Sequence, residues 1–174
     1  MASGTSRGRF VWYELLTTDP GRAKEFYKKI VGWGTEAWPG GSDYTMWTNQ
    51  GQPLGGLLTL PEQAARAGAT PHWLASITTP DLDGTIAQAQ KLGGSTRVPP
   101  TAMPQVGRWA VLADPQGAAF TAFTPEGPGR PYEAPRVGEI SWHELMTSVE
   151  PSEALRFYQA LFGWEKVEEH DMGP

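Results

Sequence analysis

Two side chains in this sequence, Glu14 and His72, have acid–base chemistry and lie in stretches rich in aromatic residues. Glu14 follows Trp12 by two residues, so the two side chains share one face if this stretch is a strand. A carboxylate beside aromatic rings loses water, which raises its pKa and would let it act as a general base. An imidazole at His72 could be a base, a metal ligand or a hydrogen-bond donor. Both residues are therefore candidate catalytic residues.

Both candidates also have explanations that involve no chemistry. Glu14 could pair with an arginine such as Arg108, or extend into solvent, because unpaired buried carboxylates are rare. A single histidine near the start of a strand, such as His72, is often structural or exposed. The residue types alone leave these alternatives open.

Composition argues against several other kinds of chemistry and partner. The 174 residues contain no cysteine, which excludes thiolate catalysis, disulfides and cysteine-ligated metals. The net charge of −5 argues against nucleic-acid binding, which needs a basic surface. No apolar run approaches the roughly 20 residues of a membrane-spanning helix, and the N-terminus has no apolar signal region. We therefore expect a cytoplasmic protein without a nucleic-acid or membrane partner.

The elements that must position Glu14 occur twice in the chain. The two copies are 130 residues apart across a predicted strand and 131 residues apart across a predicted helix. A repeat of this length indicates a duplicated structural unit and not a solenoid. The matched residues are Trp12 with Trp142, Glu14 with Glu144, Phe26-Tyr27 with Phe157-Tyr158, and Gly32-Trp33 with Gly163-Trp164.

The first copy predicts one strand, one helix and three further strands. Alternating side chains predict a strand over residues 10–17. Asp19-Pro20 is a typical helix start and Gly32 a typical helix end. The helix between them carries an apolar stripe of Ala23, Phe26, Tyr27, Ile30 and Val31. The three further strands are predicted over residues 33–38, 43–48 and 53–60.

The same order of elements follows in residues 71–125, after a short polar connection that has one or two helical turns at most. This second cycle of elements predicts a strand over 72–78, a helix from the N-cap Asp81 through Lys91, and strands over 95–98, 108–113 and 118–123. Asp114-Pro115-Gln116-Gly117 is typical of a tight turn between the last two strands.

A third, partial cycle follows a linker rich in Pro and Gly. It predicts a strand from Ile140, a helix through Phe162 and the start of another strand from Trp164. The predicted fold class is α+β, with paired βαβββ modules at 10–60 and 71–125 that form one domain over 10–125. The other predicted segments are a disordered N-terminus at 1–9, a linker at 126–138 and a partial second domain at 139–174.

The paired βαβββ modules, the Phe-Tyr pair before Gly-Trp, and Asp114-Pro115-Gln116-Gly117 resemble the vicinal oxygen chelate superfamily. This group contains glyoxalase I, the bleomycin resistance proteins and the extradiol dioxygenases. The resemblance implies that two modules enclose a cavity, where the enzymes of the group hold a divalent metal through two histidines and a glutamate. The matching positions are Trp12, Leu74 and Thr121, which do not supply these ligands. No metal is therefore expected at the usual place, and no cofactor is predicted.

The leading functional prediction is a glyoxalase/bleomycin resistance-like protein that binds a small apolar or aromatic molecule in the cavity between the modules. One alternative is a metal-dependent lyase or dioxygenase of the same group, with displaced ligands such as Glu14, His72 and Glu144. Another is a scaffold whose cavity is filled by its own side chains, so catalysis itself stays open. The candidate ligand-binding residues are Trp12, Leu74, Trp109, Thr121 and Phe123.

The partial third module would expose the apolar stripe of its helix and an unpaired strand edge. Both features are liabilities in a monomer, because they favour association. We therefore predict that residues 137–174 dock on another chain or on the edge of the first domain, and expect a homodimer.

Overall fold

The computed structural model of the chain describes residues 7–40, 44–127 and 133–170. These residues form strands and helices of an α+β fold, which confirms the predicted fold class. They divide into two compact units. Of the described residues, the first unit contains 10–40, 44–76 and 133–144, and the second unit contains 7–9, 77–127 and 145–170.

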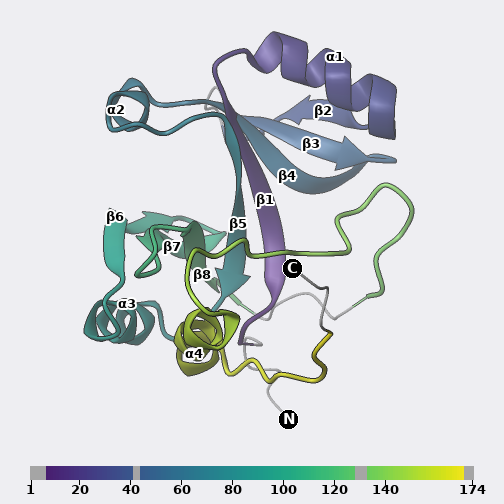
Figure 1. Cartoon of the computed structure of the whole chain (residues 1–174). Helices are drawn as coiled ribbons and strands as arrows, with labels where there is room; N and C mark the ends of the chain where they lie inside the picture. The colour runs from purple at the N-terminus through teal and green to yellow at the C-terminus, as the bar shows by residue number, and fades with distance from the viewer. Residues whose placement is uncertain (1–6, 41–43, 128–132, 171–174) are drawn as a thin grey trace. The chain divides into compact units, whose positions relative to one another are not determined.

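The strands of the first unit lie in the order β2-β3-β4-β1-β5 (Figure 1). β1 runs parallel to β4, with Glu14 opposite Gly56, whereas β2, β3 and β4 pair antiparallel. The predicted strands are confirmed to within two residues, and Asp43, expected in the third of them, lies outside the described residues. The bounds are β1 Phe10–Thr17, β2 Gly34–Ala37, β3 Thr45–Asn49, β4 Gln52–Thr59 and β5 His72–Thr78, whose last two residues belong to the second unit.

Helix α1, Pro20–Val31, lies along one side of β2, β3 and β4 in the first unit (Figure 1). It begins where the Asp19 carboxylate accepts a hydrogen bond from the Arg22 backbone N–H at 2.9 Å. It ends at Gly32, whose φ of 75° is left-handed and therefore suits glycine. Both predicted helix ends are confirmed. A second, short helix, α2, spans Glu62–Arg66 in the connection before β5.

The core of the first unit lies between α1 and the sheet and is largely aromatic. The Tyr27 ring of α1 lies at its centre, with ring centroids 5.4 Å from those of Trp33, Trp47 and Trp73. Leu15 and Leu57 are buried in the same cluster. Burial of these large side chains is the main stabilising contribution to this unit.

The opposite side of this sheet carries different residues, because side chains alternate along each strand. Since Leu15 and Leu57 face α1, their neighbours Glu14 and Gly56 face away from the helix. We call this side of β1, β3 and β4 the open face.

The second unit contains three antiparallel strands in the order β8-β7-β6, with α3 and α4 side by side (Figure 1). β6 continues past the predicted end at Val98, through Pro99 and Pro100. Proline is tolerated there because β6 is the outer strand of the three and its register with β7 shifts twice. The bounds are α3 Leu82–Lys91, β6 Ser95–Met103, β7 Gly107–Ala113, β8 Ala119–Pro125 and α4 Pro151–Phe162.

The apolar stripe of α4 is buried within the second unit, which agrees with the predicted alternative that this segment docks on its own chain. Phe157 and Tyr158 pack on Phe120 of β8, with ring centroids 6.3 and 5.8 Å away. The Tyr158 hydroxyl donates a hydrogen bond to Asp114 at 2.9 Å. The physical reason is that α4 docks on β8 of its own chain, which removes the stripe from water. An exposed stripe on this helix was one reason to expect a homodimer. The buried stripe removes that reason, and the homodimer stays a prediction.

The strands predicted for the third module do not form in the described residues 133–144 and 164–170. A strand there would need a neighbouring strand to pair its backbone groups, and no described strand supplies one. Two side chains of the first unit instead form hydrogen bonds with the backbone of residues 137 and 138. Trp33 Nε1 donates to the Gly138 carbonyl at 2.6 Å, and Asn49 Nδ2 donates to the Val137 carbonyl at 2.9 Å.

The N-terminal segment 1–9 was predicted to be disordered, but its residues 8 and 9 are ordered in the second unit. The Gly8 N–H donates to the Thr78 carbonyl and the Thr78 N–H donates to the Arg9 carbonyl, both at 2.8 Å. Trp164 Nε1 donates to the Gly8 carbonyl at 2.9 Å. These bonds fix residues 8 and 9, while residues 1–6 lie outside the described part of the chain.

Candidate functional site

A hydrogen-bonded chain of three side chains lies on the open face of the first unit. Trp12 Nε1 donates to the Tyr44 hydroxyl at 2.9 Å, and that hydroxyl donates to Glu14 Oε1 at 2.9 Å. β1 carries Trp12 and Glu14, and Tyr44 immediately precedes β3. Of the described residues, only Tyr44 is hydrogen-bonded to Glu14.

Burial changes the proton affinities within this chain. Loss of water raises the pKa of Glu14 above its ordinary value, and the hydrogen bond from Tyr44 lowers it only in part. Burial also raises the pKa of Tyr44, and the charge of Glu14 raises it further. Tyr44 is therefore a neutral hydrogen-bond donor, and Glu14 has the increased proton affinity that suits a general base.

Tyr44 is the residue of this site that sequence reasoning missed. Its hydroxyl lies over Gly56, where a Cβ would overlap it. Gly56 is opposite Glu14 on the neighbouring strand, so the glycine leaves room for the tyrosine beside the carboxylate. The Gly55-Gly56 pair is the signal that could have indicated a close approach at this point of the sheet.

The residues at the metal-ligand positions of the superfamily do not fit a metal. Trp12 and Leu74 lie in the first unit, on β1 and β5, and Thr121 lies in the second unit, on β8. Trp12 donates its ring N–H to Tyr44, and Leu74 is apolar and buried. Within the described ranges, no three His, Cys, Asp or Glu side chains are grouped so that they could hold a metal ion.

The displaced ligand set of Glu14, His72 and Glu144 is not such a group either, although all three residues are described. Glu144 accepts a hydrogen bond from Trp142 at 3.2 Å, and His72 Nδ1 lies 2.6 Å from the Thr70 carbonyl oxygen. These side chains therefore do not support the metal-dependent alternative.

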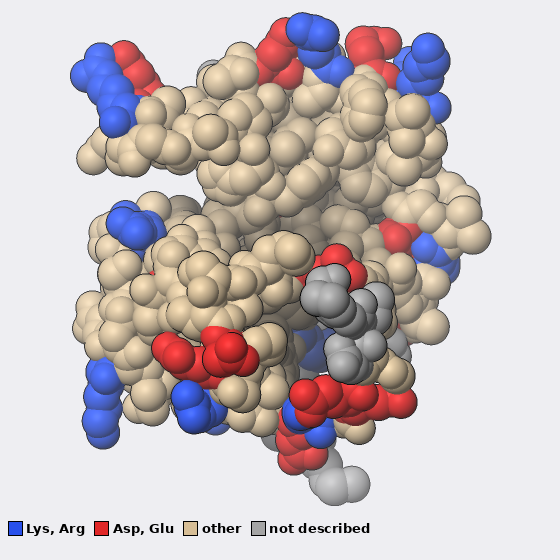
Figure 2. Space-filling view, viewed as in Figure 1, with Lys and Arg blue, Asp and Glu red and all other residues tan. Residues whose placement is uncertain are grey.

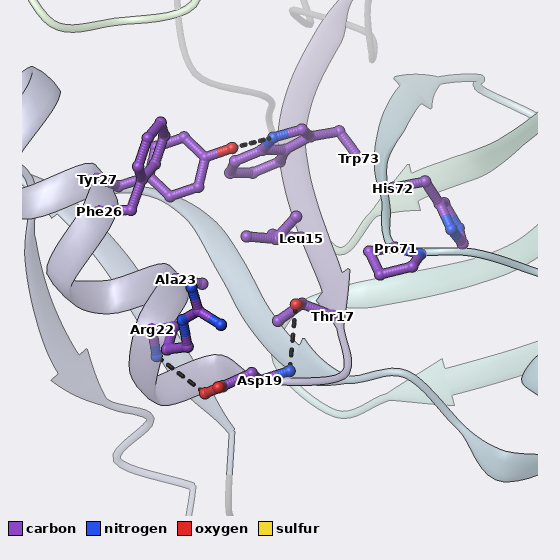
Figure 3. Close-up of a pocket in the computed structure, with 10 residues that line it drawn as sticks. All are labelled: Leu15, Thr17, Asp19, Arg22, Ala23, Phe26, Tyr27, Pro71, His72 and Trp73. Atoms are coloured by element: carbon purple, nitrogen blue, oxygen red, sulfur yellow. Dashed lines mark hydrogen bonds between the residues drawn. The ribbon is translucent and has the colours of Figure 1, made fainter.

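His72 lines a separate pocket of the first unit, between α1 and the strands β1 and β5 (Figure 3). The pocket has a volume of about 480 Å³. Neither Trp12 nor Glu14 lines it, so the structure does not bring the two candidate catalytic residues into one site. The lining residues are Leu15, Thr17, Asp19, Arg22, Ala23, Phe26, Tyr27, Pro71, His72 and Trp73.

The other predicted ligand-binding residues share one face of the second unit's sheet. Trp109 of β7 is directly opposite Phe123 of β8, and Thr121 lies two residues from Phe123. Phe120 packs on α4, so strand alternation places Thr121 and Phe123 on the side turned away from that helix. The Thr121 hydroxyl is buried and has no hydrogen-bond partner among the described residues. Whether these residues and Trp12 line one cavity stays a prediction.

Arg108 was one candidate partner for Glu14 and has another partner in the second unit. Its guanidinium donates two hydrogen bonds to the Asp83 carboxylate, at 2.9 and 3.0 Å. This bond lowers the pKa of Asp83 and raises that of Arg108. The described contacts of Glu14 are therefore with a neutral hydroxyl and not with a cation.

A model of the Glyoxalase/Bleomycin resistance protein/Dioxygenase superfamily matches residues 9–121. The chain belongs to this superfamily. The match runs from β1 into β8 and includes Trp12, Glu14 and Tyr44. It confirms the family that the repeated motif had indicated.

Curated relatives in the superfamily are longer than the region they share with this chain. CFP32 of Mycobacterium bovis, whose name describes a glyoxylase, is 35% identical over 120 residues, which cover 68% of this chain and 44% of the relative. The anthracycline biosynthesis protein DauV of a Streptomyces species is 34% identical over 115 residues, or 66% of this chain and 40% of the relative. The matched region thus spans less than half of each relative.

A solved superfamily structure shares the fold of this chain. The Mn(II)-bound glyoxalase of Novosphingobium aromaticivorans superposes with a TM-score of 0.59 and 19% identity. The superposition covers 94% of this chain and 54% of that protein. At this identity the likeness supports the fold alone.

The described helices include no candidate membrane span, and the face shown in Figure 2 carries no continuous basic stripe. No described helix is long and apolar enough to cross a bilayer. On the face shown in Figure 2, Lys and Arg side chains are scattered among acidic ones, and large areas carry no charge. A continuous basic stripe is not visible on this face.

Proposed function

We propose that this superfamily member binds a small planar aromatic molecule on the open face of its first unit. The observation that carries the proposal is the chain from Trp12 through Tyr44 to Glu14. It combines a flat apolar ring with a fixed hydroxyl and a carboxyl group on one sheet face. Ligand sites commonly pair an aromatic wall with a few oriented polar groups, which is the composition found here.

The name of one relative supports a polycyclic ligand. The name of DauV carries the words "anthracycline biosynthesis", and anthracyclines contain fused planar rings. A fused ring system could stack on the Trp12 indole while a ring hydroxyl binds the Glu14 carboxyl group. Leu74, on β5 beside β1, would add apolar surface. Trp109, Thr121 and Phe123 belong to the second unit and stay predicted ligand-binding residues.

A second candidate function is proton transfer by Glu14 to or from such a ligand. The raised pKa of Glu14 favours it, because a general base works best when its pKa approaches the working pH. Tyr44 would hold the carboxyl group in place and would stabilise its ionised form. This chemistry needs no metal ligand.

Titration with an uncharged dihydroxyanthraquinone tests the binding proposal. We expect saturable binding that Trp12→Ala weakens by at least about two- to tenfold, since an aromatic pair contributes about 0.5–1.5 kcal/mol beyond area burial. Trp142→Ala is the matched control, because Trp142 occupies the same position of the repeat and is 77% exposed. Equal losses in the two variants, or no saturable binding, would reject the proposal and favour a scaffold.

The same titration separates binding from proton transfer. Glu14→Gln should weaken binding only slightly, because the amide oxygen can still accept from Tyr44. If the ligand is also converted by the protein, the Gln variant should lose that conversion while it retains binding.

A further inference from the structure

The pocket between α1, β1 and β5 lies in the first unit, on the helix side of the sheet. We infer that it binds a small aromatic acid, with the ring against Phe26, Tyr27 and Trp73 and the carboxylate at Arg22. The pocket's volume of about 480 Å³ lies within the range of roughly 300–1,000 Å³ that is usual for small-molecule sites. None of its lining residues belongs to the open-face site, so this inference is independent of the proposed function.

The aromatic end of the pocket is held in place by its own contacts (Figure 3). Trp73 Nε1 donates to the Tyr27 hydroxyl at 3.0 Å, and the two rings meet edge to face with centroids 5.4 Å apart. Phe26 packs edge to face on Tyr27, with centroids 5.1 Å apart. A wall fixed in this way costs little further ordering when a flat ligand ring binds to it.

Phe26 leaves an apolar surface uncovered at the pocket. Phe26 is 56% exposed, whereas Leu15, on the strand behind it, is 7% exposed. A ligand ring placed against Phe26 would remove part of this surface from water, which is favourable. The pocket therefore offers apolar contact both at its rim and at its base.

The polar end of the pocket carries one uncommitted cation (Figure 3). Among the described residues, the Arg22 guanidinium forms no ion pair and no side-chain hydrogen bond. The neighbouring Asp19 carboxylate is committed to the helix start, where it accepts from the Arg22 backbone N–H at 2.9 Å. The Asp19 carboxylate keeps its negative charge, so the preference for an anion rests on the Arg22 guanidinium alone, which can bind a carboxylate through two parallel hydrogen bonds.

His72 adds a hydrogen-bonding group on the far side of the pocket from α1 (Figure 3). Its Nδ1 lies 2.6 Å from the Thr70 carbonyl oxygen, which fixes the ring and leaves Nε2 available. This group can bind a second polar substituent of the ligand. The ligand class is therefore an aromatic ring with a carboxylate, with or without a further polar group.

Calorimetry with naphthoate and with the uncharged naphthamide, both added to the whole chain, tests this inference. We expect naphthoate to bind more tightly than naphthamide. Arg22→Ala should weaken naphthoate binding by about tenfold or more and leave naphthamide nearly unchanged, because it removes a charge-assisted contact. Phe26→Ala should weaken the binding of both compounds.

Two variants serve as matched controls. Arg66→Ala removes an exposed arginine of the same unit that pairs with Glu62 outside the pocket, so naphthoate binding should not change. Trp12→Ala should leave naphthoate binding intact even where it abolishes anthraquinone binding. Failure of the open-face proposal and failure of this one are therefore distinguishable.

Three results would overturn the inference. These are the absence of naphthoate binding at millimolar concentration, equal binding by Arg22→Ala and the unaltered chain, and loss of naphthoate binding in Trp12→Ala. Light scattering on the same samples provides a fourth result. A dimer that dissociates on Phe26→Ala would show that another copy of the chain covers the pocket, and that it is no ligand site.

Discussion

Ile30 and Leu161 occupy the same position of the repeated helix, 131 residues apart, yet Ile30 is 64% exposed and Leu161 is fully buried. Leu161 lies in α4, whose stripe packs into the second unit, while α1 has no buried residue. The same sequence motif thus has two different surroundings. The local sequence sets the helix, and the neighbouring surface decides what the helix buries.

The difference between these two residues predicts different losses of stability. Leu161→Ala should lower the free energy of unfolding by about 2–5 kcal/mol, because it leaves a cavity among packed side chains. Ile30→Ala should lower it by less than about 1 kcal/mol, because the side chain is largely in water already. Urea unfolding followed by circular dichroism measures both. Equal losses would show that α1 is covered in solution.

Removal of the Tyr44 hydroxyl should raise the pKa of Glu14 further. The hydrogen bond from Tyr44 is the contact that lowers this pKa against the effect of burial, so Tyr44→Phe leaves burial unopposed. Carbon NMR of labelled glutamate side chains, with Glu14→Gln for assignment, measures the shift. Tyr13→Phe is the matched control, because the Tyr13 hydroxyl binds His143 and not Glu14. A lower Glu14 pKa in Tyr44→Phe would contradict the arrangement.

Glu14 should also make stability depend on pH. Its pKa is raised in the folded state, so the folded protein binds this proton more tightly than the unfolded chain does. The resulting stabilisation is present below the unfolded pKa and is lost as pH rises through the folded pKa. Glu14→Gln should therefore gain stability relative to the unaltered chain as pH rises from acid to neutral.

Thermal melts across this pH range measure the effect, and Glu139→Gln provides a control of opposite sign. Hydrogen bonds from Arg136 lower the pKa of Glu139, so its contribution is present at neutral pH and lost as pH falls. The control effect should be small because Glu139 lies near the surface with an exposed partner. A constant difference between Glu14→Gln and the unaltered chain at every pH would contradict the burial of Glu14.

Residues 133–144 should lose protection against amide hydrogen exchange when the Asn49 side-chain amide is removed. Asn49 Nδ2 donates to the Val137 carbonyl at 2.9 Å, and such a bond contributes about 1 kcal/mol. Asn49→Ala should therefore speed amide hydrogen exchange in a peptide that covers these residues. Gln52→Ala, in the facing strand, should leave the exchange unchanged. Unaltered exchange in Asn49→Ala would mean that other contacts of the segment, such as those of Trp33 and Tyr13, are sufficient to hold it.

The sequence predicted the elements well where the signals are local. Asp19 and Gly32 mark the ends of α1 because capping depends on the nearest few residues, and the structure has both caps. The duplicated motif and the order strand, helix, three strands were sufficient to indicate the superfamily. The alternation of β1 also predicted that Trp12 and Glu14 share a face.

Only the tertiary structure decided which residues meet at a distance along the chain. Tyr44 lies 30 residues from Glu14, and no local pattern indicates that its hydroxyl bonds to that carboxylate. The burial of the α4 stripe and the absence of a strand after Ile140 also depend on which surfaces are available for pairing. Helix and strand follow from short-range backbone preference and side-chain period. The burial of a side chain, its proton affinity and the site to which it belongs depend on contacts that form only when the chain is folded.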